Sequence, residues 1–186
     1  RKKVVGYVGR IVKEKGVPQF IDAIPKIARV DNTVEYVIGG TGELLGWVKQ
    51  ESQKLEKAYN VKIRVTGFVD ESDFPNLLNE LTLLVLPTSH SEGLPTIILE
   101  SMACGTPVIV FDGTALPDVI HAPEGGVSVP AKDSKSLADA IIRLLNDKQL
   151  YAQLVENGLR IVREEYTLEK YIQRHIELYR SLLNQE

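Results

Sequence analysis

The sequence predicts a doubly wound α/β domain, in which helices cover both faces of a parallel sheet of about six strands. Short apolar runs rich in β-branched residues alternate with amphipathic helical patterns along all 186 residues. The apolar runs are mostly continuous rather than alternating, as is typical of strands that are buried on both faces. No linker, low-complexity tract or internal repeat interrupts this order. We therefore expect residues 1–186 to form a single domain.

Six runs have the length and composition of strands. Repeated strand–helix units are normally joined by right-handed crossovers, which makes the sheet parallel and Rossmann-like. The expected strands are residues 4–8, 34–38, 62–66, 83–86, 108–111 and 127–129.

Four helices are expected from apolar stripes at helical spacing. Pro18 suits the first turn of the first helix, whereas Pro25 falls inside it and predicts a kink or a lost hydrogen bond. Ser134 is the expected N-cap of the third helix. A further helix is expected to begin near Pro95. The stripes are Phe20, Ile21, Ile24, Ile27 and Ala28; Leu44, Leu45, Val48 and Leu55; Leu137, Ile141, Leu144 and Leu145; and Leu168, Ile172, Ile176, Tyr179 and Leu183.

Composition limits what the protein can bind. The formal net charge is −3, so no global field attracts nucleic acid or anionic lipid, and we expect no nucleic-acid partner. No apolar run approaches the ~18 residues that a membrane span needs. The single cysteine, Cys104, excludes an intrachain disulfide and suits a reducing compartment. We expect a cytoplasmic location and a small, buried packing role for Cys104 on its helix.

The chain opens at Arg1 without a methionine, and strand-like sequence begins by Val4. The only methionine is Met102, in the middle of the chain. We therefore expect a further, N-terminal domain that is missing from these residues.

Loops at the carboxyl ends of the strands are where a doubly wound sheet binds ligands. These are residues 9–16, 39–43, 67–70, 87–95 and 112–118. Glycine lies close to the strand end in most of them. It either lets backbone approach a ligand or lets a turn take a positive φ, and both interpretations stay open at this point.

Residues 87–96 carry the strongest chemical signal. Glu92 and Gly93 come just before the helix expected near Pro95, whose unpaired N–H groups can face an anion. Glu100 follows Gly93 by seven residues, nearly two helical turns, which places the two on one face. Apolar neighbours indicate a partly buried carboxylate that needs partners such as sugar hydroxyls. A solvated helix carboxylate is the alternative.

Arg10 and Lys15 form the second signal. Arg10 follows the first strand directly and Lys15 precedes the first helix, so both can project over the same strand ends. Arginine forks onto phosphate oxygens, and lysine supplies a compact charge. Two ordinary surface cations are the alternative.

These stretches resemble a known family. The matching residues are Val8-Gly9-Arg10 with Lys15-Gly16, Gly40-Thr41-Gly42, Gly67-Phe68-Val69, and Pro87 through Glu92 to Glu100-Ser-Met-Ala-Cys-Gly-Thr-Pro107-Val. Over essentially the whole chain they resemble, in order, the C-terminal domain of the group 1 (family 4) glycosyltransferases. Glycogen and sucrose synthases are similar at a greater distance. The resemblance implies the nucleotide-sugar-binding half of a two-domain GT-B fold.

The resemblance implies a role for each matching residue. Arg10 and Lys15 would hold the donor diphosphate and stabilise its charge during catalysis, and Glu92 would lie against the donor sugar. The implied substrate-binding residues are Gly9, Gly40 and Gly42, Gly67, Phe68 and Val69 beside the nucleobase, Gly93 and Leu94 through their N–H groups, and Glu100 at the ribose.

The resemblance also implies retaining transfer of a hexosyl group from a UDP-, GDP- or ADP-sugar. Cationic side chains and the helix start would replace Mg²⁺, so no cofactor and no essential metal are expected. The acceptor, whether glycan, lipid or small molecule, would be held by the missing domain. Peripheral contact with the inner face of a membrane could arise through that domain too. The isolated domain is expected to bind nucleotide but to transfer sugar poorly.

Two motifs depart from the family pattern. The commoner Glu-Gly-Phe-Gly is replaced by Glu92-Gly93-Leu94-Pro95, and Pro95 lacks a backbone N–H. Asp118 stands where a glutamate is frequent. His90 fits an ordinary loop histidine better than a catalytic one.

Other functions fit parts of the sequence. A GT-B-fold phosphorylase or a nucleotide-sugar epimerase would share the fold, and a non-catalytic nucleotide-binding module would share the site. The glycines at 40, 42 and 46 superficially suggest an NAD(P) site, but they follow the second strand rather than the first. The glycine-rich pattern of phosphate-loop NTPases is absent.

Overall fold

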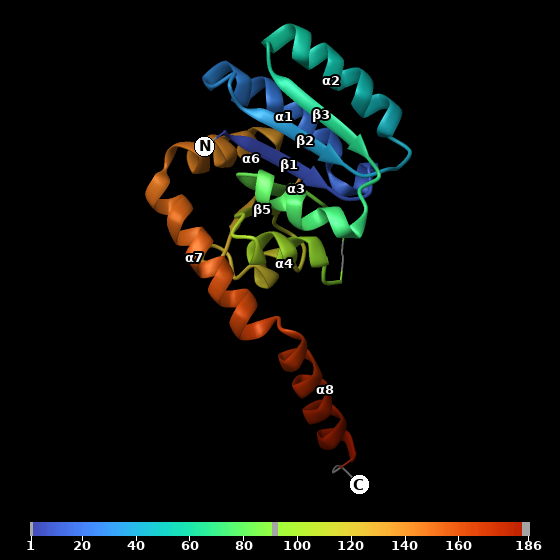
Figure 1. Ribbon diagram of the computed structural model, residues 1–186, viewed down its shortest axis with the longest axis vertical. Helices are drawn as coiled ribbons and strands as arrows, with labels where there is room; N and C mark the ends of the chain where they lie inside the picture. Colours follow the sequence, from blue (N-terminus) through green and yellow to red (C-terminus); the bar gives the residue numbers. More distant parts are fainter. Residues whose placement is uncertain (1, 91–92, 184–186) are drawn as a thin grey trace.

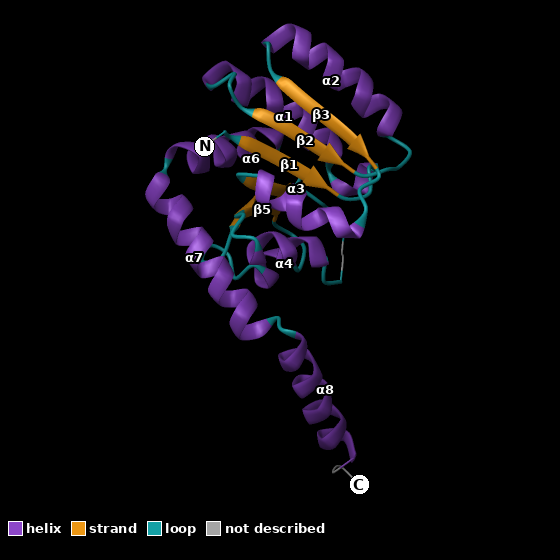
Figure 2. Ribbon diagram, viewed as in Figure 1, coloured by secondary structure: helices purple, strands orange, loops and turns teal. Residues whose placement is uncertain are grey.

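The computed structural model describes residues 2–90 and 93–183 of the chain. Its centre is a six-stranded sheet with the order β3-β2-β1-β4-β5-β6, in which every neighbouring pair is parallel (Figure 2). The strands are β1 (Val4–Val8), β2 (Glu35–Gly39), β3 (Lys62–Gly67), β4 (Leu83–Leu86), β5 (Val108–Phe111) and β6 (Val127–Val129). The predicted fold class is confirmed. Four strands have the expected bounds, β2 lies one residue later, and β3 is one residue longer.

The central strands are the most buried part of the sheet. All residues of β1, β4 and β5 are buried, which is why their apolar runs are continuous. The order 3-2-1-4-5-6 reverses direction between β1 and β4. The loops after these two strands therefore lead to opposite faces of the sheet and leave room for a ligand between them.

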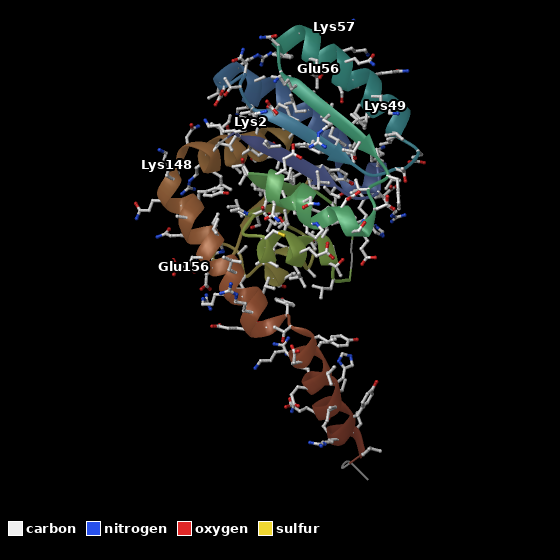
Figure 3. The ribbon with its side chains drawn as sticks, viewed as in Figure 1. Lys2, Lys49, Glu56, Lys57, Lys148 and Glu156 are labelled. Atoms are coloured by element: carbon white, nitrogen blue, oxygen red, sulfur yellow. The ribbon has the colours of Figure 1, made fainter. Side chains whose placement is uncertain are left out.

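Helices cover both faces (Figure 1). On one face α1 packs against α2 and α6, and on the other α4 packs against α3 and α7. Charged side chains such as Lys49, Lys57, Lys148 and Glu156 point outward from α2 and α7 (Figure 3). The helices are α1 (Val17–Val30), α2 (Leu45–Tyr59), α3 (Phe74–Glu80), α4 (Thr96–Ala103), α5 (Leu116–Val119), α6 (Ser134–Asn146), α7 (Lys148–Glu165) and α8 (Leu168–Leu183), with short 3-10 turns at Lys13–Lys15 and Glu71–Asp73.

The structure corrects three local predictions. The N-cap of α6 is Asp133, whose carboxylate accepts from the N–H groups of Lys135 and Ser136; Ser134 is the first helical residue. Cys104 is half-buried and follows α4 as its C-cap rather than lying within the helix. Helices α3, α5 and α7 were not among the predicted helices.

Helix α1 runs unbroken from Val17 to Val30 with Pro18 in its first turn, as expected. Pro25 lies inside it, and because proline has no N–H that turn lacks one hydrogen bond. The fully buried side chains of Tyr7, Phe20 and Tyr36 pack between α1 and the sheet, with Phe20 stacked on Tyr7 and edge-on to Tyr36.

Helix α8 projects away from the rest of the molecule (Figure 1). It is joined to α7 by a two-residue bend, and none of its residues is buried. Its apolar side chains, including Leu168, Tyr171, Tyr179 and Leu183, are therefore exposed.

Candidate functional site

The candidate site is a cavity of about 300 Å³ at the carboxyl ends of β1, β2 and β3. One side is formed by the loops after these strands, and the other by the first turns of α4. Its position at the reversal between β1 and β4 is where doubly wound sheets hold ligands. The lining residues are Val8, Gly9, Arg10, Gly40, Thr41, Phe68, Val69, Phe74, Thr96, Ile97 and Glu100.

The structure brings together only some of the predicted site residues. Those that line the cavity are Gly9, Arg10, Gly40, Phe68, Val69 and Glu100, whereas Lys15, Gly42, Gly67, Gly93 and Leu94 lie outside its lining. Glu92 is outside the described residues. The roles assigned to all of these residues stay predictions.

Backbone contacts between loops explain two of the glycines. A Cβ on Gly40, where φ is 127°, would lie 1.8 Å from the Gly9 carbonyl oxygen, and one on Gly42 would lie 2.3 Å from that of Ile11. The Ile11 N–H donates to the Thr41 oxygen at 2.7 Å. Glycine at 40 and 42 is therefore required for the loops after β1 and β2 to touch. At Gly93, by contrast, a Cβ would meet nothing within 4 Å.

Arg10 is exposed at the mouth of the cavity, and its backbone is anchored by a hydrogen bond from a residue of β1. The hydroxyl of Tyr7, whose side chain is fully buried in β1, donates to the Arg10 carbonyl oxygen at 2.6 Å. This contact fixes where the Arg10 backbone leaves the sheet. The Arg10 guanidinium can then reach an anion in the cavity from a backbone whose position is fixed.

Lys15 is half-buried and ends the short 3-10 turn after β1. Gly16 follows it with a φ of 74°, and a Cβ there would lie 1.8 Å from the Pro87 carbonyl oxygen. The Thr88 hydroxyl and the Ser89 N–H both donate to the Glu14 carbonyl oxygen, at 3.1 and 3.2 Å. The β1–α1 loop is thus bonded to the loop after β4.

Helix α4 begins near Pro95, as predicted, which leaves Gly93 two residues before its N-cap. Its N-cap is Pro95 and its first residue is Thr96, so Gly93 is not helical and the same-face prediction for Gly93 and Glu100 was wrong. Instead Thr96 and Ile97, four and three residues before Glu100, share its face of the helix and line the cavity with it. The first-turn N–H groups at this helix start lack i−4 carbonyl partners within the helix.

Glu100 is half-buried and borders a second cavity of about 310 Å³ between α3 and α4. Phe74 also lines both cavities. Burial, reinforced by the charge of Glu100, raises the pKa of the Cys104 thiol in this second cavity. Each of the two cavities beside Glu100 has both polar and apolar lining residues. This setting suits a ligand that carries both hydroxyls and a ring.

Sequence reasoning missed five lining residues, which are Val8, Thr41, Phe74, Thr96 and Ile97. Thr41 and Thr96 were visible as neighbours of assigned residues. Phe74 lies in α3, whose seven residues are too few for a helical stripe to be recognised.

Three other polar residues are placed elsewhere. His90 is exposed on the loop after β4, and Asp118 is exposed in α5. His121 pairs with Glu165 at the end of α7, with 3.3 Å between Nε2 and Oε2. None of the three lines the cavity of about 300 Å³.

Within residues 2–90 and 93–183, no three His, Cys, Asp or Glu side chains gather in a way that could hold a metal ion. No helix within these ranges combines the length and the apolar character that crossing a bilayer requires.

Comparison with known families gives a match over most of the chain. Residues 1–160 match the family model of the glycosyl transferases group 1. Alpha-D-kanosaminyltransferase of Streptomyces kanamyceticus is 32% identical over 169 residues, which cover 90% of this chain and 42% of that protein. The chain thus spans less than half the length of this relative.

Solved structures share the fold. The C-terminal domain of a group 1 family glycosyl transferase from Francisella tularensis is 29% identical, with a TM-score of 0.80 over 90% of this chain and 87% of that one. Anabaena HepE in complex with UDP-glucose has a TM-score of 0.84 over 97% of this chain and 49% of that one. At 23% identity this second likeness concerns the fold alone.

Proposed function

The chain belongs to the glycosyl transferases group 1, and from that premise we propose that it binds the nucleoside-diphosphate-sugar donor of a retaining hexosyltransferase. The observation that carries the proposal is the cavity of about 300 Å³, which has Arg10 at its mouth, the start of α4 at its side and Glu100 within. A cation and free helix amides suit a diphosphate, and a carboxylate suits the hydroxyls of a pentose.

Each residue would act on a defined part of the donor. Arg10 and Lys15 bind the diphosphate oxygens and stabilise the negative charge that grows as the bond from the anomeric carbon to phosphate oxygen breaks. The N–H groups of Thr96 and Ile97 add positive potential at the helix start. Glu100 accepts hydrogen bonds from the ribose hydroxyls, and Phe68 and Val69 border the base.

Retention follows if the acceptor oxygen attacks from the face that the phosphate leaves. The new bond forms between the acceptor oxygen and the anomeric carbon, while the leaving diphosphate takes the acceptor proton. Glu92 would lie against the donor sugar. The chain's own contribution is charge stabilisation of the leaving group, because this is the chemistry that its cations and helix amides can supply.

The acceptor and its contacts are assigned to polypeptide beyond these residues. Two of the relatives are more than twice as long as the matched segment. Other relatives carry different compounds in their names, phosphatidyl-myo-inositol in a Mycobacterium leprae mannosyltransferase and poly(ribitol-phosphate) in a Staphylococcus aureus N-acetylglucosaminyltransferase. We therefore propose that the acceptor class, whether glycan, lipid or small molecule, is set by that further polypeptide. We also propose a cytoplasmic location, because a single cysteine suits a reducing compartment.

A thermal-shift panel of UDP, GDP, ADP and NAD on the 186-residue chain tests the proposal. One nucleoside diphosphate should raise the melting temperature and NAD should not. Binding should be equal in Mg²⁺ and in EDTA, because side chains supply the positive charge. A shift with NAD alone would favour the dinucleotide module instead.

Substitution of Arg10 tests the diphosphate assignment. Arg10→Ala should weaken binding of the selected nucleotide about tenfold or more, because a charge-assisted hydrogen bond is worth ~1.5–3 kcal/mol. Arg163→Ala, an exposed arginine on α7 outside the cavity lining, is the matched control and should bind as the unchanged chain does. Equal affinity in both variants would remove Arg10 from the site. Product analysis with the longer enzyme would separate transfer from epimerisation or phosphorolysis.

A further inference from the structure

Thr88 is a buried polar residue that the proposed chemistry does not use. It lies two residues beyond β4, its side chain is 0% exposed, and it does not line the cavity. Its hydroxyl donates to the Glu14 carbonyl oxygen at 3.1 Å, and it can accept from the His90 N–H at 3.4 Å. A buried hydroxyl with partners on two segments can hold them in register.

The segment that Thr88 contacts is held on both sides of Lys15. On one side, the Glu14 carbonyl oxygen accepts from both Thr88 and Ser89. On the other, Gly16 approaches Pro87 so closely that no side chain would fit between them. Lys15 therefore stands between two points that are fixed to the loop after β4.

This link crosses the place where the sheet order reverses. The strands β1 and β4 are paired, but β1 continues into α1 on one face and β4 into α4 on the other. Sheet hydrogen bonds end with the strands, so the spacing of the two loops depends on contacts made beyond them. A cavity lined by the loop after β1 and by the start of α4, which follows the loop after β4, needs that spacing to be fixed.

We infer that Thr88 is a positioning residue that holds Lys15 in the place from which it binds a diphosphate. The inference rests on the proposed function, because it assigns Thr88 an effect only through Lys15. Without the Thr88 hydroxyl, the Glu14 carbonyl oxygen keeps only the Ser89 N–H as a donor. The loop that carries Lys15 is then held less firmly. The diphosphate part of the binding energy is then lost, whereas the nucleoside part is kept.

The test compares Kd for UDP and for UMP by calorimetry on the 186-residue chain, or for the guanosine or adenosine pair if the panel selects it. Thr88→Val removes the hydroxyl and keeps the side-chain volume, whereas Thr88→Ala removes both the hydroxyl and the methyl group. Thr88→Ser keeps the hydroxyl. Thr106→Val is the matched control, because Thr106 is 1% exposed and its hydroxyl donates to the Leu78 carbonyl oxygen at 2.9 Å. Melting temperatures establish that each variant is folded.

Thr88→Val and Thr88→Ala should weaken UDP binding by about fivefold to tenfold and UMP binding by less than about twofold. Thr88→Ser should restore UDP binding. Thr106→Val should lower the melting temperature without changing the UDP-to-UMP ratio. If Thr88→Val changes the two affinities equally, or no more than Thr106→Val does, the positioning role is overturned.

A double variant separates this inference from the proposal beneath it. Lys15→Ala should weaken UDP binding selectively, and adding Thr88→Val should weaken it no further, because both act on one contact. If Lys15→Ala leaves UDP binding intact, the proposed role of Lys15 fails and the inference fails with it. If Lys15→Ala is selective but the two effects add fully, only the inference on Thr88 is wrong.

Discussion

Glu100 lies where two cavities meet, one at the strand ends and the other between α3 and α4. A carboxylate placed there can accept from two adjacent hydroxyls. Nucleotides that lack the 2′- or the 3′-hydroxyl should therefore bind the unchanged chain about tenfold less tightly than the parent nucleotide. In Glu100→Ala this difference should vanish, and calorimetry with the ribose and deoxyribose forms measures it. Glu71→Ala is the control, since Glu71 lines the second cavity only. A preference for ribose that survives in Glu100→Ala would contradict the assignment.

Asp31 gives the chain a defined acid sensitivity. Its carboxylate accepts from Lys3 Nζ at 2.7 Å and from the hydroxyl and N–H of Thr33, and these contacts lower its pKa from 3.8 to about 2. Because the folded pKa lies below the unfolded one, this contribution to stability is present above pH 4 and is lost as the pH falls towards 2. Urea unfolding at pH 4 and pH 2 should therefore show a smaller loss in Asp31→Asn than in the unchanged chain. Lys3→Met should likewise show a smaller loss of stability between pH 4 and pH 2 than the unchanged chain. An identical pH dependence in all three proteins would refute the link.

At the scale of elements, the strands were predictable and several helices were not. A strand buried on both faces is a continuous apolar run, so even the bounds of β4 and β5 follow from the sequence. In α7 the only fully buried residues are Leu154, Gly158 and Ile161, one of which is a glycine. The sequence nevertheless carries a helical stripe there, with apolar residues at 150, 151, 154, 155, 161 and 162, so α7 was overlooked rather than hidden. The error at the start of α6 arose because Asp133 and Ser134 are both good caps, and only the backbone shows which one is extended.

The cap of α6 can be tested directly. Asp133 is 3.0 Å or less from the N–H groups of Lys135 and Ser136, and its second oxygen accepts from the Ser136 hydroxyl. Asp133→Ala should lower the free energy of unfolding by ~1 kcal/mol, because two helical N–H groups lose their acceptor. Ser134→Ala is the control and should cost less than about 0.5 kcal/mol. Urea denaturation measures both, and a larger cost for Ser134→Ala would reverse the assignment.

At the scale of the whole molecule, the strand-end rule was enough to bring Gly9, Gly40 and Val69 to one cavity, although they are far apart in the sequence. It could not show which glycines serve loop packing, because that depends on distances between backbones such as the one between Gly40 and Gly9. The strand-end rule also does not predict contacts between loops, because loops have no periodic pattern in the sequence. The site was therefore predictable as a location, and its internal geometry was not.

The projection of α8 from the body predicts that this helix adds little to the stability of the fold. Its large apolar side chains are 38–77% exposed, so little of their surface is removed from water, and burial is what would stabilise the helix. The chain before it is anchored by its own contacts, since the Tyr166 hydroxyl donates to the Val119 oxygen at 3.2 Å. The α8 side chains that carry this argument are Leu168, Tyr171, Ile172, Ile176, Leu178, Tyr179, Leu182 and Leu183.

Removal of residues 168–186 should therefore change the free energy of unfolding by less than about 1 kcal/mol and preserve a single cooperative urea transition. It should also reduce self-association of the chain in sedimentation velocity, because an exposed apolar face of this kind promotes contact between molecules. Replacing Ile172 and Tyr179 by serine in the full chain is the matched control, and it should reduce association while leaving the helix in place. A truncated chain that unfolds without cooperativity would mean that α8 packs against the body in solution, in contrast to the arrangement in Figure 1.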